Sequence, residues 1–149
     1  MAKATTIEKP AELLLVEDNP GDVRLIEEAL KESPLQINLH VAKDGTEAMA
    51  FLRRAGKHME APPVDLVLLD LNLPGKDGRE ILAEIKGDER LRRTPVIVLT
   101  TSEAKEDVLK AYELNANCYI TKPLNLDEFV EVVRTIGEFW FTIVTLPPR

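Results

Sequence analysis

The chain has 149 residues, 44% of them hydrophobic and 30% charged, which predicts one globular domain and excludes a disordered chain. Its net charge of -7 at pH 7, without a clustered Lys/Arg face, argues against nucleic acid as a partner, because neutralising phosphates needs such a face. No segment approaches the roughly 20 consecutive apolar residues of a membrane span and no signal peptide is recognisable, so we expect a cytoplasmic protein that binds no membrane.

The chain begins with a polar leader, residues 1–11, which we expect to be flexible. Residues 13–16 are then apolar, as in a short strand, and the two acids Glu17 and Asp18 follow them. An Asn and a Pro come next, which are preferred residues for an N-cap and for the first position of a helix. Apolar residues continue from there at helical spacing, so the sequence predicts a helix over residues 20–31.

Residues 37–41 alternate apolar and polar side chains, which predicts a second strand at the edge of a sheet. Asp44 then caps a second helix, whose inward-facing residues extend to Ala55. A polar loop follows, and residues 64–70 form the third strand. Five of the six residues before Asp70 are apolar, which is typical of a strand that is buried on both faces.

The second half of the chain repeats this alternation. Asp77 caps a third helix, residues 95–99 form a fourth strand, and Ser102 is placed to cap a fourth helix. Residues 117–120 form a fifth strand, and Asn125 caps the last helix. Parallel strands need crossover helices between them, so this order predicts an α/β fold: a doubly wound, five-stranded parallel sheet with helices on both faces.

Polar side chains follow four of the predicted strands: Glu17 and Asp18 the first, Asp70 the third, Thr100 the fourth and Lys122 the fifth. Each of them alone has an ordinary explanation as a loop charge or a strand-end residue. Parallel strands, however, end at the same edge of a sheet, where open α/β sheets bind their ligands. Three carboxylates at one place repel one another and need cations, and Mg²⁺ prefers such oxygen ligands.

The chain resembles the receiver domains of two-component response regulators over about residues 12–139. The likeness rests on Val16-Glu-Asp, on the Leu-Asp-Leu-Asn-Leu-Pro-Gly-Lys-Asp-Gly segment at 69–78, on Thr100 and on Lys122-Pro123. It implies a flavodoxin-like strand order, 2-1-3-4-5, with five helices, and a cis peptide bond between the lysine and the proline.

The chain is similar in particular to the stand-alone regulators of bacterial and cyanobacterial phytochrome-type histidine kinases. This narrower likeness rests on the Asn-Leu-Pro-Gly segment at 72–75, on the Asn-Cys-Tyr-Ile-Thr-Lys-Pro segment at 117–123 and on the apolar ending at 138–148. It implies that a histidine kinase, of the phytochrome type, is the partner of this protein.

The resemblance implies a phosphoacceptor site. Asp70 would take a phosphoryl group from a phosphohistidine and form an acyl phosphate. Asp18, Asp70 and the backbone carbonyl of Asn72 would hold Mg²⁺, with Glu17 beside the ion or joined to it through water. The ammonium of Lys122 would balance the charge of the phosphoryl oxygens during the transfer.

The resemblance also implies a switch. Thr100 would donate its hydroxyl to the new phosphoryl group, and Tyr119 would move between exposed and buried positions, although a packing role also explains this tyrosine. The face made by the fourth helix, fifth strand and fifth helix, residues 102–137, would then contact other proteins, or the phosphoryl group would pass to a downstream phosphotransfer protein. We expect a phosphoacceptor that assists its own phosphorylation and slow dephosphorylation, and not an enzyme.

The C-terminal extension, residues 140–149, and the residue before it are unusually apolar for a chain end. Aromatic residues are frequent in interface cores. The candidates for an interface are Phe139, Trp140, Phe141, Ile143 and Leu146. Two interpretations stay open: the extension folds back on its own domain, or it joins a homodimer or the kinase.

A Mg²⁺-dependent phosphohydrolase that acts on a small phosphate ester is the alternative function. Haloacid-dehalogenase-type enzymes also use an aspartate at a strand end as the nucleophile, but they carry a second acid two residues later. Here that position is Asn72, so the chain lacks the general acid and turnover should be slow.

Overall fold

A computed structural model describes residues 10–149. Five parallel strands form one sheet in the order β2-β1-β3-β4-β5, which confirms the predicted order and the edge position of the second strand. The strands are β1 (Ala11–Val16), β2 (Ile37–Ala42), β3 (Leu66–Leu69), β4 (Val96–Thr100) and β5 (Cys118–Thr121). The predicted flexible leader falls mostly on residues 1–9, which lie outside the described residues.

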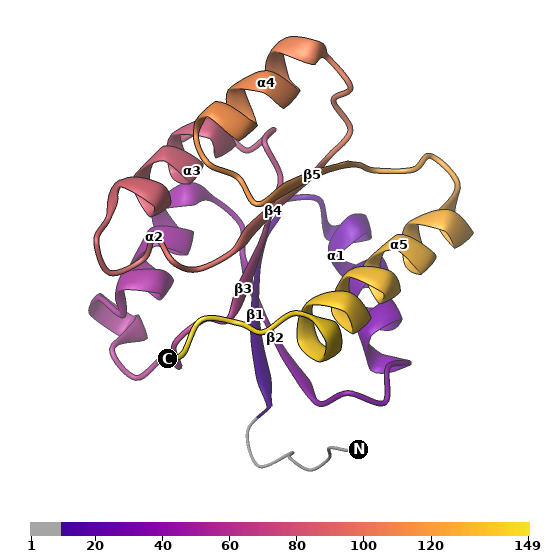
Figure 1. Ribbon diagram of the computed structural model, residues 1–149, viewed down its shortest axis with the longest axis horizontal. Helices are drawn as coiled ribbons and strands as arrows, with labels where there is room; N and C mark the ends of the chain where they lie inside the picture. Colours follow the sequence, from indigo (N-terminus) through magenta and orange to yellow (C-terminus); the bar gives the residue numbers. More distant parts are fainter. Residues whose placement is uncertain (1–9) are drawn as a thin grey trace.

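Five α-helices cover the two faces of this sheet. Figure 1 shows α1 and α5 on one face and α2, α3 and α4 on the other, as crossover connections require. The helices are α1 (Pro20–Lys31), α2 (Gly45–Arg53), α3 (Gly78–Gly87), α4 (Lys105–Glu113) and α5 (Leu126–Glu138). A short 3₁₀ turn (Gly56–His58) follows α2, and a π-helical turn (Phe139–Ile143) follows α5. None of the helices in residues 10–149 combines the length and hydrophobicity that a membrane-spanning segment needs.

The sheet separates two hydrophobic cores. Alternate residues of a strand point to opposite faces, so Leu66 and Leu68 of β3 pack on the α1 and α5 side, while Val67 and Leu69 pack on the side of α2 and α3. All four β3 side chains are fully buried. This two-sided burial explains the continuous apolar run before Asp70 and fixes that carboxylate at the end of a rigid strand.

Four of the five helices begin at the predicted N-cap. The side chains of Asn19, Asp44, Asp77 and Asn125 each accept a hydrogen bond from a backbone N–H in the first turn, at 2.7–3.1 Å. The prediction for Ser102 is wrong, because α4 begins only at Lys105 and has no side-chain cap.

Two local features, one a side-chain hydrogen bond and the other a backbone conformation, explain where the sequence-based helix limits fail. The hydroxyl of Ser102 donates to the carboxylate of Asp107 at 2.5 Å, so the segment before α4 is a loop and not a helical turn. The predicted inward position of Ala55 is also wrong. Arg54 takes a left-handed conformation, with φ at 57°, which ends α2 and leaves Ala55 exposed.

The chain after α5 lies against its own domain. Trp140 and Phe141 pack on the core beside α1 and α5, whereas Phe139 and Ile143 stay 45% and 71% exposed. In Figure 1 the final residues, in yellow, run from α5 across the lower part of the sheet to the side that α2 covers. There the guanidinium of Arg149 forms an ion pair with Asp65 and donates to the carbonyl of Pro10 at 3.1 Å. The structure therefore shows the folded-back arrangement, with part of the apolar surface left open.

Candidate functional site

An acidic cluster lies at the carboxyl ends of β1 and β3. Glu17 and Asp18 directly follow β1, and Asp70 directly follows β3, which is the neighbouring strand. Each of the three residues has a carboxylate oxygen within 4.8 Å of the others. Glu17 and Asp70 are buried, while Asp18 is exposed. The structure thus brings the three predicted acids together at one edge of the sheet.

A buried ammonium group reaches into this cluster. Lys122 follows β5, and its Nζ donates to Glu17 Oε1 at 2.7 Å, to Asp22 Oδ2 at 2.8 Å and to Asp70 Oδ2 at 3.1 Å. All three donors of the ammonium are used, which orients it. The cis bond implied between Lys122 and Pro123 is wrong: this bond is trans, and the side chain reaches the carboxylates from it.

Asp22 is the member of the site that sequence reasoning missed. It lies in the first turn of α1, where its backbone N–H donates to the Asn19 side chain at 3.1 Å. Its carboxylate points instead to the ammonium of Lys122. An acid in a first turn has an ordinary explanation in the helix dipole, so this position carried no distinct signal.

The electrostatics of the site are dominated by excess negative charge, since three carboxylates contact one ammonium and the carboxylate of Asp18 lies beside them. Burial raises the pKa of Glu17 to about 7, and the charge of Asp70 adds to this rise, against the lowering effect of Lys122. Burial alone would lower the pKa of Lys122, but hydrogen bonds to Asp22 and Glu17 outweigh it and raise that pKa. The lysine therefore stays charged, and the cluster as a whole still favours a further cation.

The donor set fits a hard divalent ion. Three carboxylates from two adjacent strand ends offer oxygen ligands, which Mg²⁺ prefers, and the exposed Asp18 leaves a side open to water. Asn72 lies next to Asp70, and its backbone N–H donates to Asp70 Oδ1 at 3.1 Å. This bond orients the carboxylate, while the role of the Asn72 carbonyl as a metal ligand stays a prediction.

The predicted switch residues lie on β4 and β5. Thr100 is completely buried at the end of β4, and its hydroxyl accepts a long hydrogen bond, 3.5 Å, from the Asn72 side chain. Tyr119 is half-buried in β5, and its hydroxyl donates to the carbonyl of Ser102 at 2.9 Å. Both side chains thus contact loops that follow the ends of β3 and β4.

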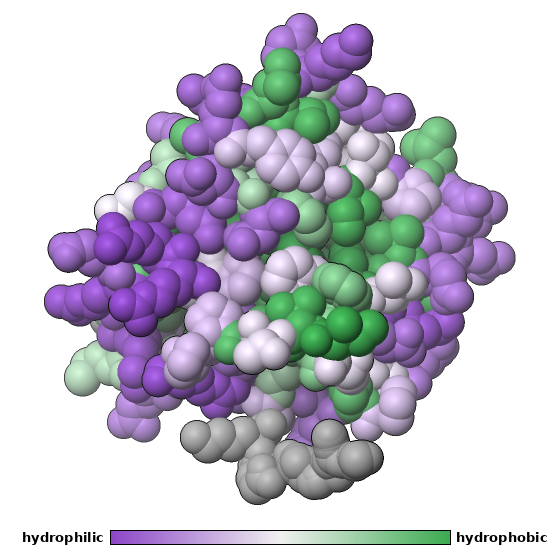
Figure 2. Space-filling view, viewed as in Figure 1, coloured by the Kyte–Doolittle hydropathy of each residue, from purple (hydrophilic) through white to green (hydrophobic). Residues whose placement is uncertain are grey.

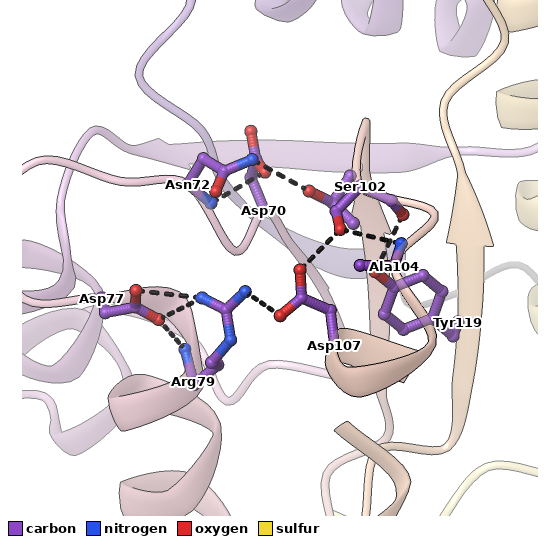
Figure 3. A network of polar contacts seen from close by, with 9 residues as sticks. Asp70, Asn72, Asp77, Arg79, Ser102, Ala104, Asp107 and Tyr119 are labelled. Carbon is purple, nitrogen blue, oxygen red and sulfur yellow. Dashed lines mark hydrogen bonds and ion pairs between the residues drawn. The ribbon is translucent and has the colours of Figure 1, made fainter. Parts of the chain in front are cut away.

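A polar network ties these loops together, and sequence reasoning did not find it. Figure 3 shows Arg79 of α3 between two carboxylates, those of Asp77 and of Asp107 in α4. Asp107 accepts in turn from the hydroxyl of Ser102, whose carbonyl binds Tyr119. The hydrogen bond from Ser102 and the charge of Arg79 lower the pKa of Asp107. The network therefore links the start of α3, the start of α4 and the predicted aromatic switch.

Comparisons with known proteins agree with this geometry. The response regulator receiver domain family matches residues 13–134 of the chain. Response regulator Rcp1 of Synechocystis sp. is 51% identical over 138 residues, which cover 93% of this chain and 94% of Rcp1.

Two solved structures share the fold closely. The phosphorylated cyanobacterial phytochrome response regulator RcpA superposes with a TM-score of 0.91 at 50% identity, over 94% of this chain and all of RcpA. The Mn²⁺-bound form of Rcp1 superposes with a TM-score of 0.89 at 50% identity, over 93% of this chain and all of Rcp1.

Proposed function

Because the chain belongs to the response regulator receiver domain family, we propose that Asp70 accepts a phosphoryl group from a partner histidine kinase. The observation that carries this proposal is the contact of the buried Asp70 carboxylate with the Lys122 ammonium inside the acidic cluster. The likeness to a phosphorylated phytochrome response regulator supports a phytochrome-type kinase as the donor. We place the reaction in the cytoplasm.

The transfer forms one bond and breaks another. An oxygen of the Asp70 carboxylate attacks the phosphorus of a phosphohistidine, and the phosphorus–nitrogen bond breaks in line with the attack. The electron pair stays on the imidazole nitrogen of the kinase, which takes up a proton. Lys122 is already 3.1 Å from Asp70 Oδ2, so its charge offsets that of the incoming phosphoryl oxygens without further movement.

Mg²⁺ is the proposed cofactor. Asp18, Asp70 and the Asn72 carbonyl would hold it, with Glu17 beside it, and the bound ion would neutralise phosphoryl oxygens. The Mn²⁺-bound structure of the relative Rcp1 supports a divalent ion at this cluster. Burial raises the pKa of Glu17 to about 7, and a cation bound beside this carboxyl group would lower that pKa and displace the proton.

The phosphohydrolase alternative is not favoured. The position two residues after Asp70 is Asn72, which bonds Asp70 and Thr100 but cannot act as a general acid. We therefore propose that the protein holds its phosphoryl group, with slow self-dephosphorylation, and is not an enzyme with free substrates.

We propose that phosphorylation acts through Thr100 and Tyr119. The added phosphoryl oxygens would attract the Thr100 hydroxyl, which now accepts only a long hydrogen bond from Asn72. Movement of the β4 end would disturb the Ser102 carbonyl and thereby its bond to Tyr119. The face of α4, β5 and α5 would then present a different surface to other proteins, including a downstream phosphotransfer protein.

Incubation with a small phosphodonor and Mg²⁺, followed by intact mass measurement, tests the phosphoacceptor role. Wild-type protein should gain one base-labile phosphoryl group, and Asp70→Asn should gain none. Asp127→Asn, a change on the exposed first turn of α5, should behave like wild type. An adduct of equal yield on Asp70→Asn would contradict the proposal, and so would repeated turnover of a diffusible phosphate ester by the wild type.

We also propose a homodimer through the apolar surface around α5. A groove of about 740 Å³ lies between β5 and α5, and Phe139 and Trp140 line its end. Figure 2 shows hydrophobic residues gathered in the middle of this face with hydrophilic residues around them. Such an exposed apolar patch is typical of a protein interface, and a second copy offers the same surface in return.

Sedimentation tests the dimer. The double variant Phe139→Glu/Ile143→Glu changes two exposed side chains and should shift the protein toward monomer. Leu124→Glu, at a residue that is 97% exposed and outside the groove, is the matched control and should leave association unchanged. A chain that ends at Gly137 should also be monomeric. Equal association of all these forms would show that the extension is not the interface.

A further inference from the structure

A second pocket, of about 370 Å³, lies at the opposite end of the sheet from Asp70 and is rich in arginine. It opens where the chain enters β3 and β4, beside Asp65 and Pro95. The arginines that line it are Arg53, Arg54, Arg90, Arg93 and Arg149. Asp65 is the one acid among the lining residues of the described chain. We propose that this pocket binds a nucleoside polyphosphate.

The residues that line the pocket carry a net positive charge, whereas the whole chain has a net charge of -7. Arg149 pairs with Asp65, and Arg53 makes longer contacts, 3.4 Å, with Glu84 and Asp88. The ion pairs within residues 10–149 include none of the three other lining arginines, Arg54, Arg90 and Arg93. Three arginines that line this concave surface therefore have no carboxylate partner among the described residues. A guanidinium group can donate two parallel hydrogen bonds to the oxygens of one phosphate.

The walls of the pocket are held in place before any ligand arrives. The loop that carries Arg90 and Arg93 is folded around Asp88, whose side chain accepts from the Arg90 N–H at 2.8 Å and whose carbonyl accepts from two further N–H groups. The Arg54 N–H bonds to carbonyls of the last turn of α2. Because the backbone of these walls is already ordered, ligand binding would cost no conformational entropy for ordering it, which favours affinity.

The remaining wall is apolar, which selects for a ligand with a ring as well as phosphates. Leu52, Val64 and Leu91 line the pocket together with Pro95 and two prolines near the chain end. A volume of about 370 Å³ lies in the usual range for small-molecule sites. Bases stack on guanidinium planes as well as on apolar side chains, so a nucleotide matches both kinds of surface.

The pocket is separate from the phosphoacceptor site. Asp65 and Asp70 lie at opposite ends of β3, about 17 Å apart at about 3.3 Å per residue. Part of the wall comes from the chain end, Pro147, Pro148 and Arg149, which lies beyond the residues that match the receiver family. Figure 2 shows the darkest hydrophilic colour on the left of the view, over the segment that joins α3 to β4 in Figure 1.

Calorimetric titration with ATP and with pyrophosphate tests the proposal on the full chain, in buffer with EDTA so that no metal occupies the acidic cluster. ATP should bind, and more tightly than pyrophosphate, because only ATP fills the apolar wall. The double variant Arg90→Gln/Arg93→Gln should weaken ATP binding at least about tenfold, since charge-assisted hydrogen bonds are lost. Asp70→Asn should bind ATP like the wild type.

The matched control is Arg24→Gln/Arg92→Gln, which changes the net charge equally at arginines outside the pocket lining. It should keep wild-type affinity. Amide shifts in an NMR titration should appear around Val64 and Thr94 and not around Glu17. Absence of ATP binding, equal affinity for pyrophosphate, or an equal loss in the control variant would each overturn the proposal.

Discussion

Gly78 packs directly against the backbone of Asp70. It begins α3, and its N–H donates to the carbonyl of Leu71 at 3.1 Å. A Cβ at this position would lie 2.4 Å from the Asp70 carbonyl oxygen and 2.5 Å from Leu71 Cα. Both neighbours are backbone atoms, so any larger residue must displace the segment that carries the phosphoacceptor.

We therefore predict that Gly78→Ala destabilises the protein by about 1–3 kcal/mol and slows phosphorylation of Asp70, because overpacking shifts the backbone. Urea denaturation and phosphodonor kinetics measure the two effects. The control is Gly87→Ala at the other end of α3, where an added Cβ meets no atom within 4 Å. That change should be neutral or slightly stabilising. Similar phosphorylation rates for both variants would contradict the prediction.

At the level of residues, the three acids and Lys122 could be found from the sequence because each directly follows a predicted strand of one parallel sheet. Asp22 could not be found in this way. It lies in a helix and meets Lys122 across 100 positions of sequence, and a first-turn acid needs no partner to explain it. Contacts of this kind depend on the direction in which a side chain points, and the spacing of apolar residues in the sequence does not predict that direction.

Among the elements, α4 is held by a polar anchor and not by a cap. Its first turn contains Asp107, which bonds Ser102 and Arg79 at 2.5 Å each. One buried residue, Ala111, joins α4 to the core. The orientation of this helix thus depends on the polar network, which makes the network the place where a shift at Tyr119 would be passed on.

Asp107→Asn should lower the melting temperature at pH 7 by about 2–4 °C, as expected for the loss of a modest interaction in a domain of this size. The pKa of Asp107 is lowered in the folded state by Ser102 and Arg79, so its stabilising effect is complete above its ordinary value of 3.8. This stabilisation decreases as the pH falls below 3.8, the ordinary pKa, and is lost once the pH is below the lower pKa of the folded state.

The melting temperatures of the wild type and of Asp107→Asn, measured between pH 7 and pH 3, should therefore approach each other as the pH falls. Asp127→Asn, an exposed first-turn change in α5, is the control and should follow the wild type throughout. A difference between wild type and Asp107→Asn that is constant with pH would rule out the charged network as its source.

The sequence predicted all five strands and helices because apolar periodicity and caps agree over most of the chain. It failed at the start of α4 and at the end of α2. At the start of α4, the Ser102 hydroxyl donates to Asp107, which lies further along the chain, and at the end of α2, Arg54 takes a left-handed conformation. Neither feature can be predicted from the residue type alone.

For the whole molecule, the negative net charge gave no indication of the local group of arginines. The composition argued against a clustered basic face, yet the fold collects arginines from α2, from the loop before β4 and from the chain end into one pocket. The parallel topology places acids at one end of the sheet and arginines at the other. Such a separation follows from the three-dimensional path of the chain and not from its composition.

The contact of Arg149 with the Pro10 carbonyl has a consequence for engineering, because it brings the last residue beside the first described one. In a chain without residues 1–9, a short linker could join residue 149 to residue 10 and close the backbone into a ring. New termini could then be opened in the turn at 33–36, which lies at the opposite end of the sheet from the phosphoacceptor. Such a circular permutant would leave residue 149 fixed in the interior of the chain, and fluorescent reporters could be attached at the new ends.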